Sequence, residues 1–135
     1  MIGILIVSHG AFGEALIHCA SHVLGKRPLR VRQVGITVHD DPDAILPQAQ
    51  ALVRELDEGK GVLVLTDMMG ATPANIATRL MVPGKVAVVS GVNLPMLVRA
   101  LTYRDAPLET VIAKAVSGGR EGVQQLGVAN APERG

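Results

Sequence analysis

The sequence predicts an α/β fold built on a doubly wound, mainly parallel sheet of strand order 2-1-3-4, with helices on both faces. Strand-like apolar runs alternate with amphipathic helical stretches along the chain. These runs are apolar throughout, as in strands that are buried on both faces. Right-handed crossovers between parallel strands then leave few topologies. The length of 135 residues favours one domain.

In the first half of the chain the alternation begins with a strand over residues 2–7, where apolar residues follow one another. Apolar residues at helical spacing predict a helix over 11–24, with Cys19 on its buried face. A second strand is expected over 31–38. A second helix is expected over 43–56, although Pro47 limits where it can begin.

The second half repeats the pattern. Thr72 is expected to cap a short helix because Pro73 suits the first helical position. Asn93 is expected to cap the next helix, and Gly118 and Gly119 weaken the last one. The expected elements are a strand over 61–66, a helix over 72–80, a strand over 86–89, a helix from 93 to 101 and a helical stripe over 108–126.

Composition excludes several classes of protein. An apolar fraction of 48% and a mean hydropathy of +0.34 exclude a disordered chain. Apolar runs of about five residues are too short to span a membrane, and no signal peptide is expected. A net charge of +1, with Phe12 and Tyr103 the only aromatic residues, argues against nucleic-acid binding. Cys19 is the only cysteine, which suits a reducing, cytoplasmic location.

Polar residues follow the two strands that flank the point where the chain reverses direction. The first strand runs into Ser8-His9-Gly10, and the third runs into Thr66-Asp67. The crevice at the carboxyl ends of these strands is the usual ligand site of such a sheet. Asp67 can accept a hydrogen bond from one ring nitrogen of His9 and leave the other available as a nucleophile, a general base or a metal ligand. A structural pair that holds two strand ends together is the alternative.

Two helix N-termini are expected at the same crevice, one after Gly10 and one at Thr72. Free backbone N–H groups and the Thr72 hydroxyl favour an anion such as phosphate. The chain has no P-loop and no GxGxxG segment, so no bound nucleotide is indicated. We therefore expect Gly10 and Thr72 to bind phosphate, and we expect no cofactor and no metal.

Three segments resemble the mannose-family IIA domain of the bacterial phosphoenolpyruvate-dependent sugar phosphotransferase system. They read ILIVSHGAFGEAL from Ile4, LTDMMGATPANIA from Leu65 and SGVNLPML from Ser90. The segments stand in family order, and the resemblance covers residues 1–127. Thr72 stands where the family usually has serine, and Met69 where it often has an aromatic residue.

This resemblance implies a phosphocarrier. His9 would accept a phosphoryl group from the phosphocarrier protein HPr and pass it to a IIB partner, and Asp67 would orient the ring. It also implies a homodimer that exchanges an antiparallel strand, for which the tail over 128–135 is the candidate, starting from Gly127-Val128-Ala129-Asn130. Contact with a membrane would be only indirect, through a permease complex.

Other functions remain open at this point. The same motifs fit a phosphocarrier that serves dihydroxyacetone kinase, or a regulatory IIA protein without a sugar partner. A tetrapyrrole metal chelatase also begins with a strand ending in His-Gly, but it leaves the second and third segments unexplained. A histidine phosphatase would need arginine at Ser8. A non-catalytic interaction module is the remaining alternative.

The remaining polar clusters have simpler interpretations. Glu14, His18 and His22 share one helical stripe, which we expect to be solvated rather than a zinc site. The segment His39-Asp40-Asp41 precedes Pro42 and is explained by a turn as well as by a partner contact. Arg99 and Arg104 are expected to be solvated charges.

Overall fold

The computed structural model describes residues 1–127, and its centre is a four-stranded parallel sheet. The strand order is β2-β1-β3-β4, and every neighbouring pair is parallel, which confirms the predicted topology. The tail over 128–135, expected to supply the exchanged strand, lies outside the described residues. The strands are β1 (Gly3–His9), β2 (Val31–Ile36), β3 (Val62–Thr66) and β4 (Val86–Ser90).

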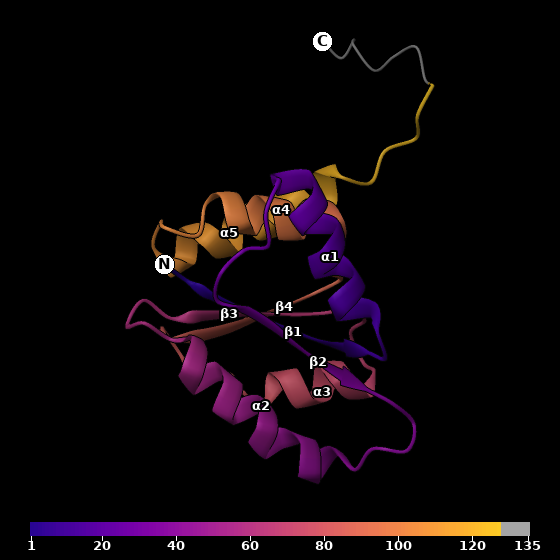
Figure 1. Cartoon of the computed structure of the whole chain (residues 1–135), viewed down its shortest axis with the longest axis vertical. Helices are drawn as coiled ribbons and strands as arrows, with labels where there is room; N and C mark the ends of the chain where they lie inside the picture. Colours follow the sequence, from indigo (N-terminus) through magenta and orange to yellow (C-terminus); the bar gives the residue numbers. More distant parts are fainter. Residues whose placement is uncertain (128–135) are drawn as a thin grey trace.

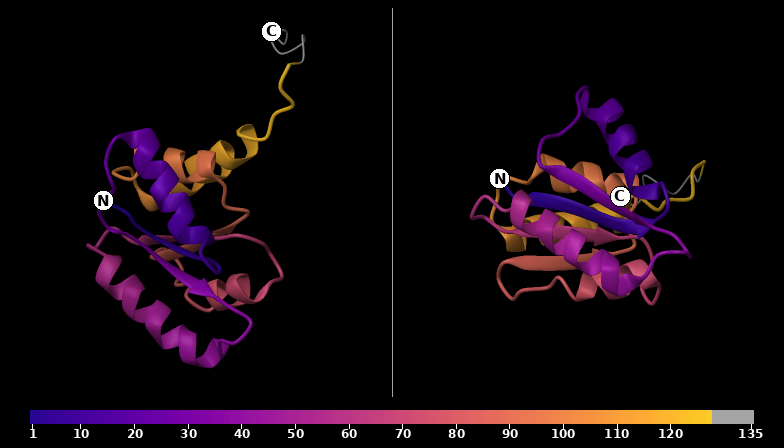
Figure 2. Two further views of the ribbon diagram at one scale, coloured as in Figure 1. Left: turned by 45° about the vertical axis from the view of Figure 1, so that its right-hand side comes forward. Right: turned by 60° about the horizontal axis from the view of Figure 1, so that its bottom comes forward.

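Helices cover both faces of this sheet, as predicted. Figure 1 shows α1, α4 and α5 on one face and α2 and α3 on the other, and the rotated views keep the same two layers (Figure 2). The helices are α1 (Phe12–Leu24), α2 (Pro42–Leu56), α3 (Thr72–Thr78), α4 (Leu94–Thr102) and α5 (Leu108–Glu121). None of the helices within residues 1–127 has the length and apolar character needed to cross a membrane.

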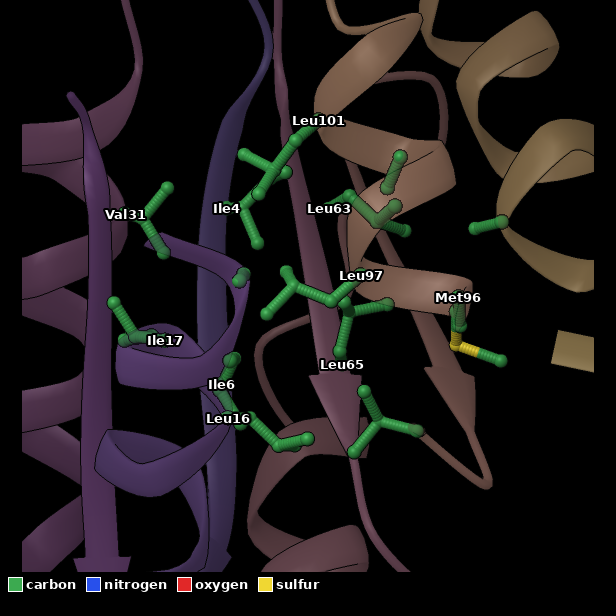
Figure 3. Close-up of a cluster of buried hydrophobic side chains, with 14 of the residues drawn as sticks. Ile4, Ile6, Leu16, Ile17, Val31, Leu63, Leu65, Met96, Leu97 and Leu101 are labelled. Atoms are coloured by element: carbon green, nitrogen blue, oxygen red, sulfur yellow. The ribbon is translucent and has the colours of Figure 1, made fainter. Parts of the chain in front are cut away.

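The sheet separates two hydrophobic clusters because successive side chains of a strand point to opposite faces. Ile4 and Ile6 of β1 face α1 and α4, whereas Leu5 and Val7 face α2 and α3. Figure 3 shows the first cluster, in which Ile4 and Ile6 lie beside the side chains of β3 and α4. Burial of β1 on both faces explains why its sequence is apolar throughout.

The buried face of α1 differs from the expected one. Leu16, Ile17 and Ala20 are buried together with Gly13, but Cys19 is exposed, so the core position predicted for this thiol is wrong. The apolar stripe is wider than the contact surface that α4 and the sheet provide. Its outer members therefore remain in solvent, namely Phe12, Ala15, Val23 and Leu24.

The last helix ends at Glu121, before the predicted limit of 126. Leu126 is exposed, and the glycines thought to weaken the helix are buried and pack it against α4. A Cβ atom at Gly118 would lie 2.7 Å from the Arg99 Cβ, and one at Gly119 would lie 2.7 Å from the Met96 Cε. Glycine has a low helix propensity, but the close contact between α5 and α4 that these two glycines permit offsets this cost.

Local hydrogen bonds set the helix starts and the end of β2. Asn93 caps α4 as predicted, since its Oδ1 accepts from the Met96 N–H. At α3 the N-cap is Ala71, so Thr72 is the first helical residue and its hydroxyl makes no cap bond. Strand β2 ends before Thr37 because the Thr37 N–H donates to the Asp40 carboxylate instead of a neighbouring strand.

Arg104 is buried, contrary to the expectation of a solvated charge. Its guanidinium Nε and Nη2 donate to the carbonyl of Ile2, at 3.0 and 2.8 Å, and further donations reach the carbonyls of Leu29 and Arg30. Burial lowers the pKa of this guanidinium, although the charge of Asp105 offsets part of the effect. Arg104 therefore ties the start of β1 to the segment that leads into β2.

Replacing Arg104 should destabilise the fold. Arg104→Met removes the guanidinium from three backbone carbonyls, of which Arg30 keeps the Ile4 N–H as a donor, so we expect the free energy of unfolding to fall by about 3 kcal/mol in urea titrations. Arg104→Lys should restore part of the loss because one ammonium can reach some of these carbonyls. Arg54→Met, at an exposed position, should change stability by less than about 0.5 kcal/mol. Equal losses in Arg104→Met and Arg54→Met would contradict this role.

Candidate functional site

His9 and Asp67 come together at the carboxyl ends of the two central strands. His9 is the last residue of β1, and Asp67 directly follows β3. The parallel register pairs Val7 with Thr66, so the next residues of both strands leave the sheet side by side. The juxtaposition predicted from the switch-point topology is confirmed.

Three hydrogen bonds hold the Asp67 carboxylate. Its Oδ2 accepts from the backbone N–H of His9 at 2.9 Å and lies 2.7 Å from Nδ1 of the His9 ring. Its Oδ1 accepts from the Met68 N–H at 2.9 Å. The same oxygen therefore fixes both the backbone and the ring of His9. Sequence reasoning missed the backbone bond, for which the residue types carry no signal.

The electrostatics of the carboxylate decide which ring nitrogen carries the proton. Burial raises the pKa of Asp67, but the hydrogen bonds from the His9 backbone, the His9 ring and the Met68 N–H outweigh it and lower the pKa below its ordinary value of 3.8. Asp67 is therefore ionised at neutral pH and can only accept hydrogen bonds. In the neutral ring Nδ1 must then carry the proton, which leaves the lone pair on Nε2.

Solvent reaches this free nitrogen. The His9 side chain is 55% exposed, whereas the Asp67 side chain is only 15% exposed. The carboxylate thus holds the ring through Nδ1 and leaves the side of the ring that carries Nε2 open to another molecule. A neutral imidazole oriented in this way can act as a nucleophile or as a general base.

The turn after His9 depends on two glycines. Gly10 has φ +50°, and its N–H donates to the carbonyl of Ile36 at 2.9 Å. A Cβ atom at Gly35 would lie 2.0 Å from the Gly10 oxygen, so only glycine fits there. A Cβ at Gly10 would itself meet nothing within 4 Å. At Gly10 the positive φ, and not a lack of space, therefore favours glycine, and its N–H is already used.

Thr72 lies at the start of α3, five residues after Asp67 in the chain. Its side chain is exposed and makes no hydrogen bond to any residue between 1 and 127, including His9 and Asp67. The hydroxyl is available for a ligand because Ala71, rather than Thr72, occupies the N-cap position.

Among residues 1–127, the other histidines make no hydrogen bond to His9 or Asp67. His18 and His22 are exposed on α1, which confirms the solvated stripe, and the neighbouring Glu14 forms an ion pair with Arg27 at 3.1 Å. Within the described part of the chain, no group of three or more His, Cys, Asp or Glu side chains could hold a metal ion.

The polar segment after β2 forms the predicted turn. Asp40 Oδ2 accepts from the Thr37 N–H and hydroxyl, and Asp41 Oδ1 accepts from the Asp43 N–H at the start of α2. Both carboxylates thus have a structural role, and the turn explains the segment without a partner.

Comparison with known proteins identifies the family of this chain. Residues 3–116 match the EIIA-man family, described as the PTS system fructose IIA component. The mannose-specific EIIAB component of the PTS system of Escherichia coli K12 is 36% identical over 128 residues. That alignment covers 93% of this chain but only 39% of the Escherichia coli protein. The fructose-specific EIIA component of Bacillus subtilis is 26% identical over 106 residues, covering 78% of this chain and 72% of that protein.

Solved structures of related proteins share the fold. The phosphotransferase system component EIIA from Streptococcus agalactiae superposes with a TM-score of 0.82 at 28% identity, covering 93% of this chain and 97% of that chain. The PTS IIA protein associated with the fucose utilization operon of Streptococcus pneumoniae gives a TM-score of 0.80 at 28% identity, with 92% of each chain covered. The family match extends over most of the sequence and includes both members of the His9–Asp67 pair, and the chain belongs to the mannose/fructose IIA family of the phosphotransferase system.

Proposed function

We propose that this protein is a phosphocarrier whose His9 accepts a phosphoryl group from phosphorylated HPr and passes it to a IIB protein or domain. The observation that carries the proposal is the 2.7 Å contact between Asp67 Oδ2 and His9 Nδ1, which directs Nε2 outward. Membership of the family supports a phosphotransferase rather than a chelatase or a phosphatase.

Transfer to His9 proceeds by in-line displacement. The lone pair of Nε2 forms a bond to phosphorus while the bond from phosphorus to the donor histidine breaks, and that electron pair returns to the donor ring. The His9 ring becomes positively charged, and the ionised Asp67 stabilises it through the Nδ1 proton. The reverse displacement delivers the group to the IIB partner.

Backbone groups and one hydroxyl would stabilise the phosphoryl oxygens. The amides at the start of α1, which Ala11 leaves without a side-chain cap, are suited to an anion. The exposed Thr72 hydroxyl would add a donor from α3, and Gly10 would leave room for the phosphoryl group beside the ring. The proposed site therefore consists of His9 and Asp67 for the chemistry and of Gly10 and Thr72 for the phosphate.

We also propose that the protein forms a homodimer in the cytoplasm. The outer edge of β4 has no neighbouring strand within residues 1–127. A groove of about 600 Å³ runs beside this edge, between Val88 and Val89 of β4 and Ile112 and Val116 of α5. An added antiparallel strand would pair with the free edge and cover the groove. The tail after Leu126 of a second copy is the strand proposed for this place.

Substitution of His9 tests the central proposal. Incubation with phosphoenolpyruvate, enzyme I and HPr should add one acid-labile, base-stable phosphate, bonded to Nε2, and His9→Ala should abolish it. Mass spectrometry counts the phosphate, and phosphorus NMR distinguishes the two ring nitrogens. Asp67→Ala should slow the transfer by about two orders of magnitude because the ring loses both its orientation and its counter-charge.

The other histidines serve as matched controls. His18→Ala, His22→Ala and His39→Ala should accept phosphate at the rate of the unsubstituted protein, because none of them contacts Asp67. Phosphate on the His9→Ala protein at the unsubstituted rate would refute the mechanism.

The ionised state of Asp67 predicts how stability depends on pH. Its pKa is lower in the folded protein, so its contribution is complete above the ordinary value of 3.8 and disappears as pH falls through the folded value. The difference in unfolding free energy between the unsubstituted protein and Asp67→Asn should therefore be constant above about pH 5 and shrink below it. Urea titrations at pH 7, 5 and 3 measure this difference. Asp43→Asn, on an 82% exposed side chain, should show a much smaller dependence; equal pH dependence in both variants would contradict the assignment.

Truncation tests the dimer. Sedimentation equilibrium at micromolar concentration should give a homodimer, and a chain that ends at Leu126 should dissociate because the proposed edge strand is missing. A chain that ends at Asn130 retains Gly127-Val128-Ala129-Asn130 and should remain dimeric. A monomer in the full-length protein, or a dimer that survives the shorter truncation, would count against strand exchange.

A further inference from the structure

A pocket of about 440 Å³ lies at the amino-terminal end of the sheet. Its wall is formed by the end of α1, the loop that leads into β2, the end of α4 and the residues next to them. His9 stands at the other end of β1, so the seven residues of that strand, roughly 20 Å, lie between the two places. The pocket is therefore separate from the candidate site, and its volume is in the range of small-molecule sites.

Three leucines form an apolar wall of this pocket, namely Leu24, Leu29 and Leu101, and we call them the leucine wall. Leu101 belongs to the first core cluster. Leu24 is 40% exposed and Leu29 is 73% exposed, and neither core cluster includes them. Packing among residues 1–127 leaves these two side chains in water, so a ligand with an apolar body would gain free energy by covering them.

The charged side chains that line the same pocket are all basic: Lys26, Arg27 and Arg104. Arg27 is paired with Glu14 at 3.1 Å. Lys26 is exposed and forms no ion pair with any residue between 1 and 127. The pocket therefore combines an apolar wall with an excess of positive charge, which favours an anion with an apolar body.

Arg104 adds a buried donor to this arrangement. A guanidinium has five N–H donors, and four of those of Arg104 are used by the carbonyls of Ile2, Leu29 and Arg30. The fifth belongs to Nη1 and has no acceptor within the described part of the chain. Nη1 also donates to the carbonyl of Leu29 at 2.6 Å, which places this nitrogen at the pocket wall.

The charge of Arg104 also lacks a directly bonded counter-ion. The residue is only 7% exposed, and no carboxylate among residues 1–127 forms an ion pair with it. Asp105 and Glu58 act on the guanidinium only through their more distant charges. Because buried charges in proteins are generally paired, an anion that reaches Nη1 would supply both the missing acceptor and the missing counter-charge.

We propose that this pocket binds a small aliphatic carboxylate. Its carboxylate group accepts from the unused Nη1 N–H of Arg104 and pairs with Lys26, and its hydrocarbon chain packs against the leucine wall. Inorganic phosphate would leave the leucines in water, and no aromatic side chain lines the pocket to stack on a nucleotide base. The site and the chemistry proposed for His9 do not depend on each other.

An NMR titration of the full-length protein with octanoate tests the site. Octanoate should shift the Nε–H resonance of Arg104 with a dissociation constant below about 1 mM. The Nε–H resonance of Arg54, an exposed residue of α2, should stay in place. Octylamine has the same chain with the opposite charge and should not bind. Butyrate should bind at least about tenfold more weakly than octanoate, because its shorter chain covers less of the leucine wall.

Substitutions at exposed positions test the two parts of the pocket without disturbing the fold. Lys26→Gln should raise the dissociation constant for octanoate about fivefold through the lost charge, and Leu29→Gln should do so through the lost apolar contact. Lys85→Gln and Val38→Gln are the matched controls, since both residues are exposed and neither lines the pocket. Both control variants should bind octanoate as the unsubstituted protein does.

Several results would overturn the inference. They are an unmoved Arg104 resonance, binding of octylamine with the affinity of octanoate, and equal weakening in the control variants. Binding to vesicles of anionic phosphatidylglycerol without binding of octanoate would also overturn it, because the basic surface would then be a membrane contact. His9→Ala should bind octanoate with an unchanged dissociation constant, and loss of binding in that variant would place the carboxylate at the other end of the sheet.

Discussion

The hydrogen bonds that Asp67 accepts depend on the register in which β1 pairs with β3. Val7 lies opposite Thr66, so both strands end at the same level and their next residues meet. A shift by one residue would turn the alternating side chains of β1 to the wrong faces, and it would also separate His9 from the carboxylate. The two apolar clusters on either side of β1 resist such a shift, because Ile4 and Leu5 fit different surroundings. The packing of the core therefore keeps the His9 ring in position beside Asp67.

Strand β1 is also held at its other end. Arg104 donates to the carbonyl of Ile2, and the Ile2 N–H donates to the carbonyl of Arg104 at 2.8 Å. The same guanidinium reaches Leu29 and Arg30, which lead into β2. One buried cation thus joins the first residues of the chain to two connections that lie far from them in sequence. The strand that carries His9 is fixed at both ends, which limits the motion of the ring relative to its carboxylate.

The two ends of the sheet differ in the polar groups that they use. At the amino-terminal end a guanidinium satisfies backbone carbonyls that would otherwise be buried without donors. At the carboxyl-terminal end a carboxylate accepts from two backbone N–H groups and from one ring. The first arrangement is closed to solvent, whereas the second leaves the His9 side chain 55% exposed. The closed polar contacts and the solvent-exposed ones therefore lie at opposite ends of the same strands.

Local patterns were sufficient to predict the architecture, the strand order and the pairing of His9 with Asp67. Short continuous apolar runs that alternate with helical stretches are typical of strands buried on both faces, and the chirality of crossovers then restricts the topology. The same reasoning failed where a residue's environment is made by distant parts of the chain. Cys19 belongs to an apolar stripe, but α4 and the sheet cover only part of it. Gly118 and Gly119 disfavour a helix locally and yet permit its closest contact with α4.

Arg104 shows most clearly that local sequence patterns do not predict contacts between distant parts of the chain. Its partner Ile2 is 102 residues away along the chain, so no local pattern distinguishes it from a solvated charge. The sequence by itself determined which residue types stand at the strand ends, because burial of the strands demands apolar residues up to those points. Only the tertiary structure decided which side chains remain in solvent and which Asp67 oxygen holds the ring. Those properties depend on contacts between elements, and such contacts form only when the sheet and helices are packed together.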